Sequence, residues 1–151
     1  MTTRDPRSIA AHGDTWLTDS RAYNLIWLGR WIERASSYTA ALAATAEVAG
    51  DEAAFMASCS ALANAWGLPD HSPAVIREAI ANAIRMARDD ASQVGPLELI
   101  RELNSLLSEF DQIWPSDGRA ETISALQRLH PALDDIASAI EARWFHKVTA
   151  R

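Results

Sequence analysis

Hydrophobic residues recur three and four positions apart along most of the chain, the spacing that gathers side chains on one face of an α-helix. The clearest series follows Pro96 and consists of Leu99, Ile100, Leu103, Leu106, Leu107 and Phe110. A second series keeps one phase through Ile123, Leu126, Leu133, Ala137, Ile140 and Trp144. No segment alternates apolar and polar residues between turn signals, so the pattern predicts helices and no strands.

Glycine and proline divide this pattern into segments. The expected helices run from Thr18 or Asp19 to Gly50, from 51 to 66, from 73 to 95, from 96 to 114 and from 119 to about 146. Gly50 suits a left-handed stop, and Ser72 with Pro73 suits a helix start. The last helix is expected to be kinked but continuous, because its apolar phase survives Pro131.

These segments predict an all-α fold, a helical bundle of four main helices plus one short helix. At 151 residues the chain is long enough for one domain. We expect a flexible N-terminal arm over residues 1–16, a single helical domain over 17–147 and a tail over 148–151.

The first long helix carries polar residues where a core face is expected. On a helical wheel, one arc holds Leu17, Leu25, Leu28, Trp31, Ile32, Ala35 and Leu42. Asn24 and Arg21 fall within the same arc. Burying an unpaired amide or guanidinium costs about 2 kcal/mol or more. We therefore expect both side chains to find an acceptor on another helix, on a water or on a ligand.

Aromatic and basic residues form a second stripe along the border of that arc, made of Tyr23, Trp27, Arg30 and Arg34. Two plain alternatives stand beside a binding role. Arg30, Glu33 and Arg34 have the spacing of surface ion pairs, and Trp27 with Trp31 could simply pack on neighbours. Gly29 disfavours a helix interior, which suggests that another backbone or a bound group approaches there.

Composition narrows the classes of function. A net charge of -6 and a pI near 5.1 leave no basic excess for binding nucleic acid. No segment has the length and hydrophobicity of a membrane span, and the N-terminus lacks a signal-peptide pattern, so we expect a cytoplasmic protein. The single cysteine, Cys59, fits a reducing compartment and is expected to be a small packed side chain.

The sequence identifies neither a catalytic residue nor a metal or cofactor site. A di-metal helical bundle needs Glu-x-x-His pairs, and this pattern is absent from the sequence. The histidines are scattered at His12, His71, His130 and His146. The adjacent pairs Asp89–Asp90 and Asp134–Asp135 point about 100° apart on a helix and are expected to be solvated.

The segment Asn24-Leu25-x-Trp27-Leu28-Gly29-Arg30-x-x-Glu33-Arg34-Ala35 resembles the signature "NLYWLGRYLERAE" in the first helix of the bacterial alpha-E domain family. A weaker similarity lies at Asn82, Ala83, Arg85, Arg88, Asp89, Glu98, Leu103 and Asn104. The chain departs from the family pattern at Ala81, Ile100 and Arg101, where the family has glutamate, tryptophan and glutamate.

The resemblance implies a function through partners. Alpha-E proteins occur beside ATP-grasp amide ligases and transglutaminase-like proteins, so this chain would be an accessory or substrate-holding partner that takes an amino-acid or peptide ligand. Activation chemistry would belong to the ligase, since this sequence has no glycine-rich phosphate loop. The family members are about twice as long and carry two copies of the signature helix, which suggests a homodimer here. The alternative is a dimerising interaction module without a small ligand.

One polar set is the candidate site, at the expected border of the first and third helices. It consists of Asn24, Arg30, Glu33, Arg34, Asn82, Arg85, Arg88 and Asp89. Four arginines in one cleft would favour a carboxylate or a phosphate. The alternative is an internal network in which Glu33 and Asp89 satisfy the arginines and fix the helix register.

Overall fold

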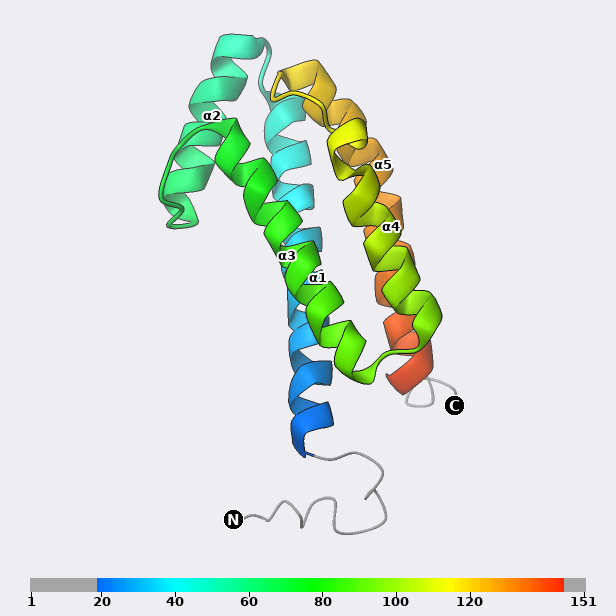
Figure 1. Cartoon of the computed structure of the whole chain (residues 1–151). Coiled ribbons are helices and arrows are strands. Elements are labelled where there is room, and N and C mark those ends of the chain that lie inside the picture. Colours follow the sequence, from blue (N-terminus) through cyan, green and yellow to red (C-terminus); the bar gives the residue numbers. More distant parts are fainter. Residues whose placement is uncertain (1–18, 146–151) are drawn as a thin grey trace.

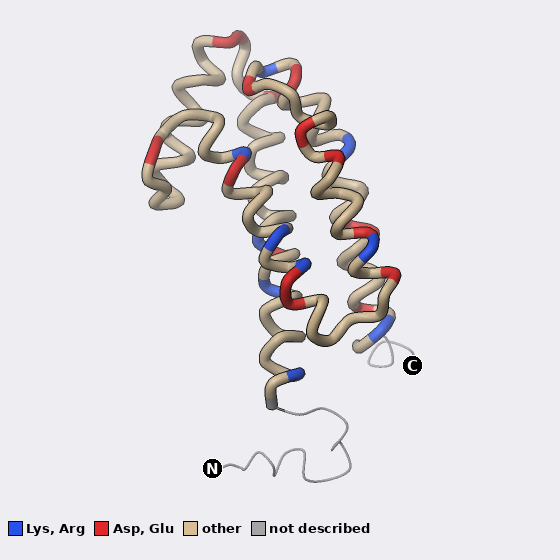
Figure 2. Tube along the Cα trace, viewed as in Figure 1, with Lys and Arg blue, Asp and Glu red and all other residues tan. Residues whose placement is uncertain are grey.

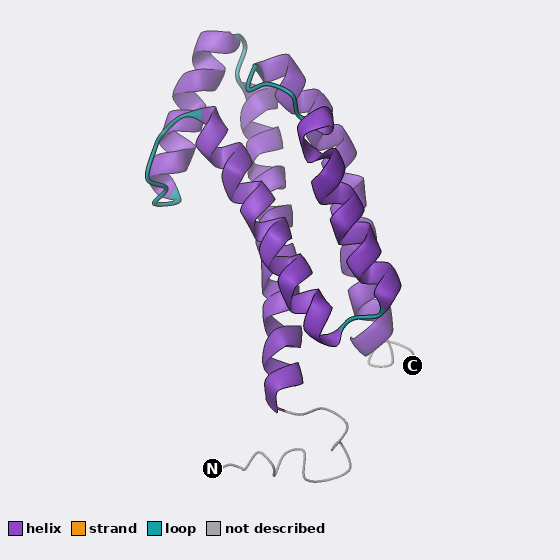
Figure 3. Ribbon diagram, viewed as in Figure 1, coloured by secondary structure: helices purple, strands orange, loops and turns teal. Residues whose placement is uncertain are grey.

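The computed structural model describes residues 19–145 of the chain. Within them the elements are α1 (Asp19–Val48), α2 (Glu52–Ala65), α3 (Pro73–Val94), α4 (Leu97–Ile113), α5 (Arg119–Ile140) and a π-helical turn, η1 (Glu141–Phe145). The described part has no strand (Figure 3). The predicted all-α bundle of four long helices and one short helix is therefore confirmed. The expected arm at 1–16, the tail at 148–151, Leu17, His12 and His146 lie outside the described residues.

The four long helices form a ring. α1 packs against α3 and α5, and α4 packs against the same two helices from the other side. The shorter α2 packs against α1 and α3, beside the C-terminal half of α1 (Figure 1). The N-terminal half of α1 thus extends past α2. None of the helices described between 19 and 145 has the length and hydrophobicity needed to cross a bilayer.

The predicted apolar faces form the core. On α1, Leu25, Leu28, Ile32, Ala35 and Leu42 are buried, and Trp31 is half-buried. On α4 the predicted face is buried or half-buried throughout its length. On α5 one assignment was wrong: Ala137 is exposed, whereas Leu129 and Ile136 are buried.

The helices end at the glycine and proline positions predicted from the sequence, with one exception. Ser72 and Pro73 start α3, Gly95 ends it, and α5 passes through Pro131 as one helix. The left-handed stop expected at Gly50 is wrong. Among the described residues, the glycine with a positive φ is Gly67, which follows α2 and has a φ of 71°. After α1 the chain is instead extended at Asp51, whose carboxylate caps α2 by accepting from the Ala54 N–H at 2.8 Å.

Three hydrogen bonds, one buried and two partly buried, join the loops to the bundle. The Trp114 indole is 2% exposed and donates to Thr122 Oγ1 at 3.3 Å, which links the end of α4 to α5. Arg77 of α3 donates to the Trp114 carbonyl at 3.2 Å. At the same end of the molecule, Arg119 Nε donates to the Ala46 carbonyl at 2.9 Å. The start of α5 is thereby tied to the end of α1.

Cys59 is a packed core residue, as expected, with no exposed surface. Burial, followed by the charges of Glu52 and Asp117, raises the pKa of its thiol to about 11. The thiolate is the reactive form, so at pH 8 we expect labelling of the native protein by a disulfide reagent to be on the order of 100-fold slower than in guanidinium chloride. Rapid labelling of the native protein would contradict this placement.

Candidate functional site

Aromatic rings and arginines form a ladder along the N-terminal half of α1. The ring centroids of Tyr23 and Trp27 lie 6.3 Å apart, and those of Trp27 and Trp31 lie 5.9 Å apart. The Arg30 guanidinium lies 5.1 Å from the Trp27 centroid, and that of Arg34 lies 4.6 Å from the Trp31 centroid. These are cation–π distances, worth about 0.5–1 kcal/mol at an exposed site. The ladder residues are Tyr23, Trp27, Arg30, Trp31 and Arg34.

The ladder contradicts the alternative in which Arg30, Glu33 and Arg34 form surface ion pairs. No ion pair joins Glu33 to Arg30 or Arg34 within the described chain, because the arginines lie over indole rings instead. Trp31 packs partly against the core, in line with plain packing, whereas Tyr23 is 62% exposed. Arg30, Glu33 and Arg34 are exposed. The N-terminal half of α1 therefore presents Tyr23, Arg30 and Arg34 to solvent, with the two ladder tryptophans half-buried beside them.

The two polar residues of the core arc have different partners. Arg21 Nη2 donates to the Val94 carbonyl of α3 at 3.5 Å, so an acceptor on another helix is confirmed for it. The same expectation is wrong for Asn24, whose Nδ2 donates to the Ser20 carbonyl of its own helix at 3.0 Å. A short amide can reach back one turn, and Asn24 is only half-buried.

The candidate residues of α3 also bond within their own helix. Arg85 pairs with Glu78, and Arg88 pairs with Asp89 at 3.3 Å. Asn82 is exposed. The neighbouring Asp90 was expected to be solvated together with Asp89 but is half-buried, and burial, then the charge of Asp89, raises its pKa.

The candidate set is divided between α1 and α3. Arg77 donates to the Trp114 carbonyl at the end of α4, so its side of α3 faces α4. Arg88 follows Arg77 by eleven residues, which is about three helical turns, and therefore lies on the same side of α3. Among residues 19–145, no hydrogen bond or ion pair joins the α1 members of the set to the α3 members. Figure 2 shows basic positions on α1 and both basic and acidic positions on α3, α4 and α5.

A hollow of about 330 Å³ lies between α1 and α5, beside the signature segment. Its lining residues are Gly29, Ile32, Glu33, Ser36, Asp134, Ala137 and Ile140. A Cβ placed on Gly29 would meet nothing within 4 Å, so no other backbone of the chain approaches it. The expected close approach at Gly29 is thus not made by the described chain. With Glu33 and Asp134 at its rim, the hollow favours a positively charged group rather than a phosphate.

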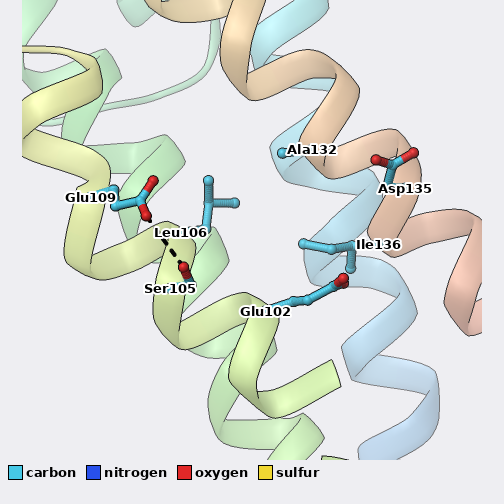
Figure 4. Close-up of a pocket in the computed structure, with 7 residues that line it drawn as sticks. All are labelled: Glu102, Ser105, Leu106, Glu109, Ala132, Asp135 and Ile136. Atoms are coloured by element: carbon cyan, nitrogen blue, oxygen red, sulfur yellow. Dashed lines mark hydrogen bonds between the residues drawn. The ribbon is translucent and has the colours of Figure 1, made fainter. Parts of the chain in front are cut away.

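A second hollow, of about 240 Å³, lies between α4 and α5 and was not anticipated from the sequence (Figure 4). Glu102, Glu109 and Asp135 surround an apolar floor formed by Leu106, Ala132 and Ile136. Ser105 donates to Glu109 at 3.4 Å across its edge. The acidic residues have no special sequence pattern, because they sit among ordinary surface positions of two amphipathic helices.

Metal-binding groups do not gather in the part of the chain that the structure describes. No cluster there has three or more histidine, cysteine, aspartate or glutamate side chains placed to hold an ion. His130 lies 3.5 Å from Asp134, one turn further along α5, and both are exposed. His71 is exposed in the loop before α3.

Comparison of the chain with protein-family models, with curated proteins and with solved structures finds no match in any of the three. The alpha-E resemblance therefore stays a prediction from residues 24–35 and 82–104.

Proposed function

We propose that this chain is a helical protein-interaction module that forms homodimers and acts as an accessory partner of an ATP-grasp amide or peptide ligase system. The observation that carries the interaction role is the ladder on α1. The ladder combines an exposed tyrosine and exposed arginines with two half-buried tryptophans, the residue types that dominate protein–protein contacts. The ligase, or a transglutaminase-like protein, as the partner rests on the alpha-E resemblance of residues 24–35.

The test is reconstitution with the ATP-grasp ligases encoded in the same genome. We expect the purified chain to co-elute with one of these ligases and to change the yield or identity of its amide product. Absence of both effects at micromolar concentrations would contradict the ligase partnership.

A matched pair of variants tests the contribution of α1. Arg34→Ala removes the guanidinium over Trp31, and Arg128→Ala removes an exposed arginine of α5. Because both are surface positions, each should change the free energy of unfolding by less than about 1 kcal/mol. We expect ligase binding to weaken only in Arg34→Ala. A loss of well over 1 kcal/mol in that variant would instead indicate a structural role for Arg34.

A second candidate function, holding an amino acid or a peptide, is favoured by the hollow beside Gly29. Its apolar floor and its two rim carboxylates suit a ligand with an amino group and an apolar side chain. Titration calorimetry with amino acids and short peptides tests this role, with ATP and phosphate as anionic controls. Heat from the controls alone would contradict the carboxylate-lined site.

A further inference from the structure

The outward face of α1 carries a regular seam. Eight positions alternate three and four residues apart, and all eight are exposed: Tyr23, Ile26, Arg30, Glu33, Ser37, Ala40, Ala44 and Glu47. This is the heptad spacing with which one helix packs along another. It lies on the side of α1 that faces away from the core residues Leu28, Ile32 and Ala35.

The seam is less polar than the outer face of a bundle helix usually is. Such faces are dominated by charged and polar groups. α4 follows that rule apart from its first residue, Leu97: its other exposed residues are Glu98, Arg101, Glu102, Asn104, Ser105, Ser108, Glu109, Asp111 and Gln112. On the α1 seam only three of the eight residues are charged, and Tyr23 and Ile26 are 62% and 54% exposed. Val48, at its end, is 85% exposed.

Side-chain size and charge are distributed unevenly along this seam. The bulky residues Tyr23 and Ile26 lie in its first half, and the small residues Ser37, Ala40 and Ala44 lie in its second half. The seam residues Arg30 and Glu33, with Arg34 beside them, lie in the middle of the helix, which runs from Asp19 to Val48.

This distribution is complementary to itself in one orientation. In an antiparallel pair of α1 helices, the bulky half of each copy faces the small half of the other. Glu33 of each copy then faces an arginine of the other copy. A parallel pair would instead oppose Arg30 to Arg30 and Glu33 to Glu33, and it would set the small residues against one another across a gap.

We propose that a second copy of this chain docks antiparallel along the α1 seam, about a twofold axis that passes between Arg30 and Arg34. Each Glu33 carboxylate pairs with the Arg30 or Arg34 guanidinium of the other copy. With this axis about 26 residues of each α1 overlap, which gives a contact line of about 40 Å. The inference rests on the homodimer of the proposed function and specifies its surface and symmetry. A ligase partner then binds the dimer rather than a single chain.

Charge reversal tests the pairing, with light scattering and sedimentation as readouts. We expect the wild type to have twice the chain mass of 16.5 kDa at micromolar concentration. Glu33→Arg should raise the dimer dissociation constant at least tenfold, because it opposes arginines across the axis. The triple variant Arg30→Glu/Glu33→Arg/Arg34→Glu reverses every charge and should restore the dimer. Glu109→Arg on α4 is the matched control and should dimerise like the wild type.

Cysteine cross-linking tests the orientation. We expect Tyr23→Cys combined with Ala40→Cys or with Ala44→Cys to give a disulfide-linked dimer under mild oxidation. A disulfide within one chain is excluded because the paired positions lie on one helix about 26 Å or more apart. Tyr23→Cys alone should give no cross-link, since it meets its own mate only in a parallel pair. The native Cys59 is fully buried and does not interfere.

The outcomes separate this inference from the proposed function. A monomeric wild type overturns the inference, and so does a dimer that is insensitive to Glu33→Arg, a triple variant that stays dissociated, or a cross-link through Tyr23→Cys alone. Ligase binding by such a protein would leave the accessory role standing. A dimer with the expected responses that binds no ligase would support the seam and contradict the ligase partnership. Thermal melts monitored by circular dichroism confirm that each variant is folded.

Discussion

Trp114→Ala should lower the free energy of unfolding by about 3–5 kcal/mol, the cost of removing a large buried aromatic side chain. The indole is 2% exposed and joins the end of α4 to the start of α5. Its loss leaves a cavity and an unpaired hydroxyl at Thr122. Urea denaturation monitored by far-UV circular dichroism measures the change. Because the indole is buried whereas the seam residues lie on the exposed outward face of α1, the dimer should survive where the variant is folded.

Two further variants separate packing from hydrogen bonding at Trp114. Thr122→Val keeps the volume but leaves the indole N–H unpaired, which should cost about 1–3 kcal/mol. Leu97→Ala, at a 58% exposed position of α4, should change the free energy of unfolding by less than about 0.5 kcal/mol. If Trp114→Ala were no more destabilising than Leu97→Ala, Trp114 would not be part of the core.

Leu28→Ala should cost about 2–5 kcal/mol, since Leu28 has no exposed surface and lies on the face of α1 that packs inside the ring. The wide range reflects how far α3 and α5 can close over the cavity. The same denaturation measurement applies. Glu33→Arg on the opposite face should leave the core intact, so the two variants separate the inner and outer faces of one helix.

The control for Leu28→Ala lies on the same helix. Val48 is 85% exposed, so Val48→Ala removes methyl groups that contact mostly water and should change stability by less than about 0.5 kcal/mol. Equal effects of the two variants would mean that α1 is not anchored through the face containing Leu28.

The sequence was sufficient to predict the helices because apolar spacing and chain breakers are local signals. Small residues limited the accuracy with which buried and exposed helix faces were assigned. Ala137 shares the phase of the buried residues on α5 but is exposed, because an alanine is indifferent to either environment and gives little information about facing. The absence of a left-handed turn at Gly50 was also beyond a local pattern, since glycine permits such a turn without requiring one.

The polar site was harder to predict because polar side chains choose among several nearby partners. Asn24 lies in the core arc, yet the carbonyl of Ser20 one turn away was sufficient for it. Arg30 has ion-pair spacing with Glu33, yet Arg30 and Arg34 lie over Trp27 and Trp31. Spacing alone does not rank a carboxylate against an indole face, and it does not show on which side of α3 Arg88 lies.

The ring arrangement has a consequence for how the protein is made. α1 packs against α5, so the first described helix is completed by the last one. While the chain emerges from the ribosome, the apolar face of α1 has only part of its cover until Leu129 and Leu133 have been synthesised. Nascent chains that stop before α5 expose that face and are open to aggregation or chaperone capture.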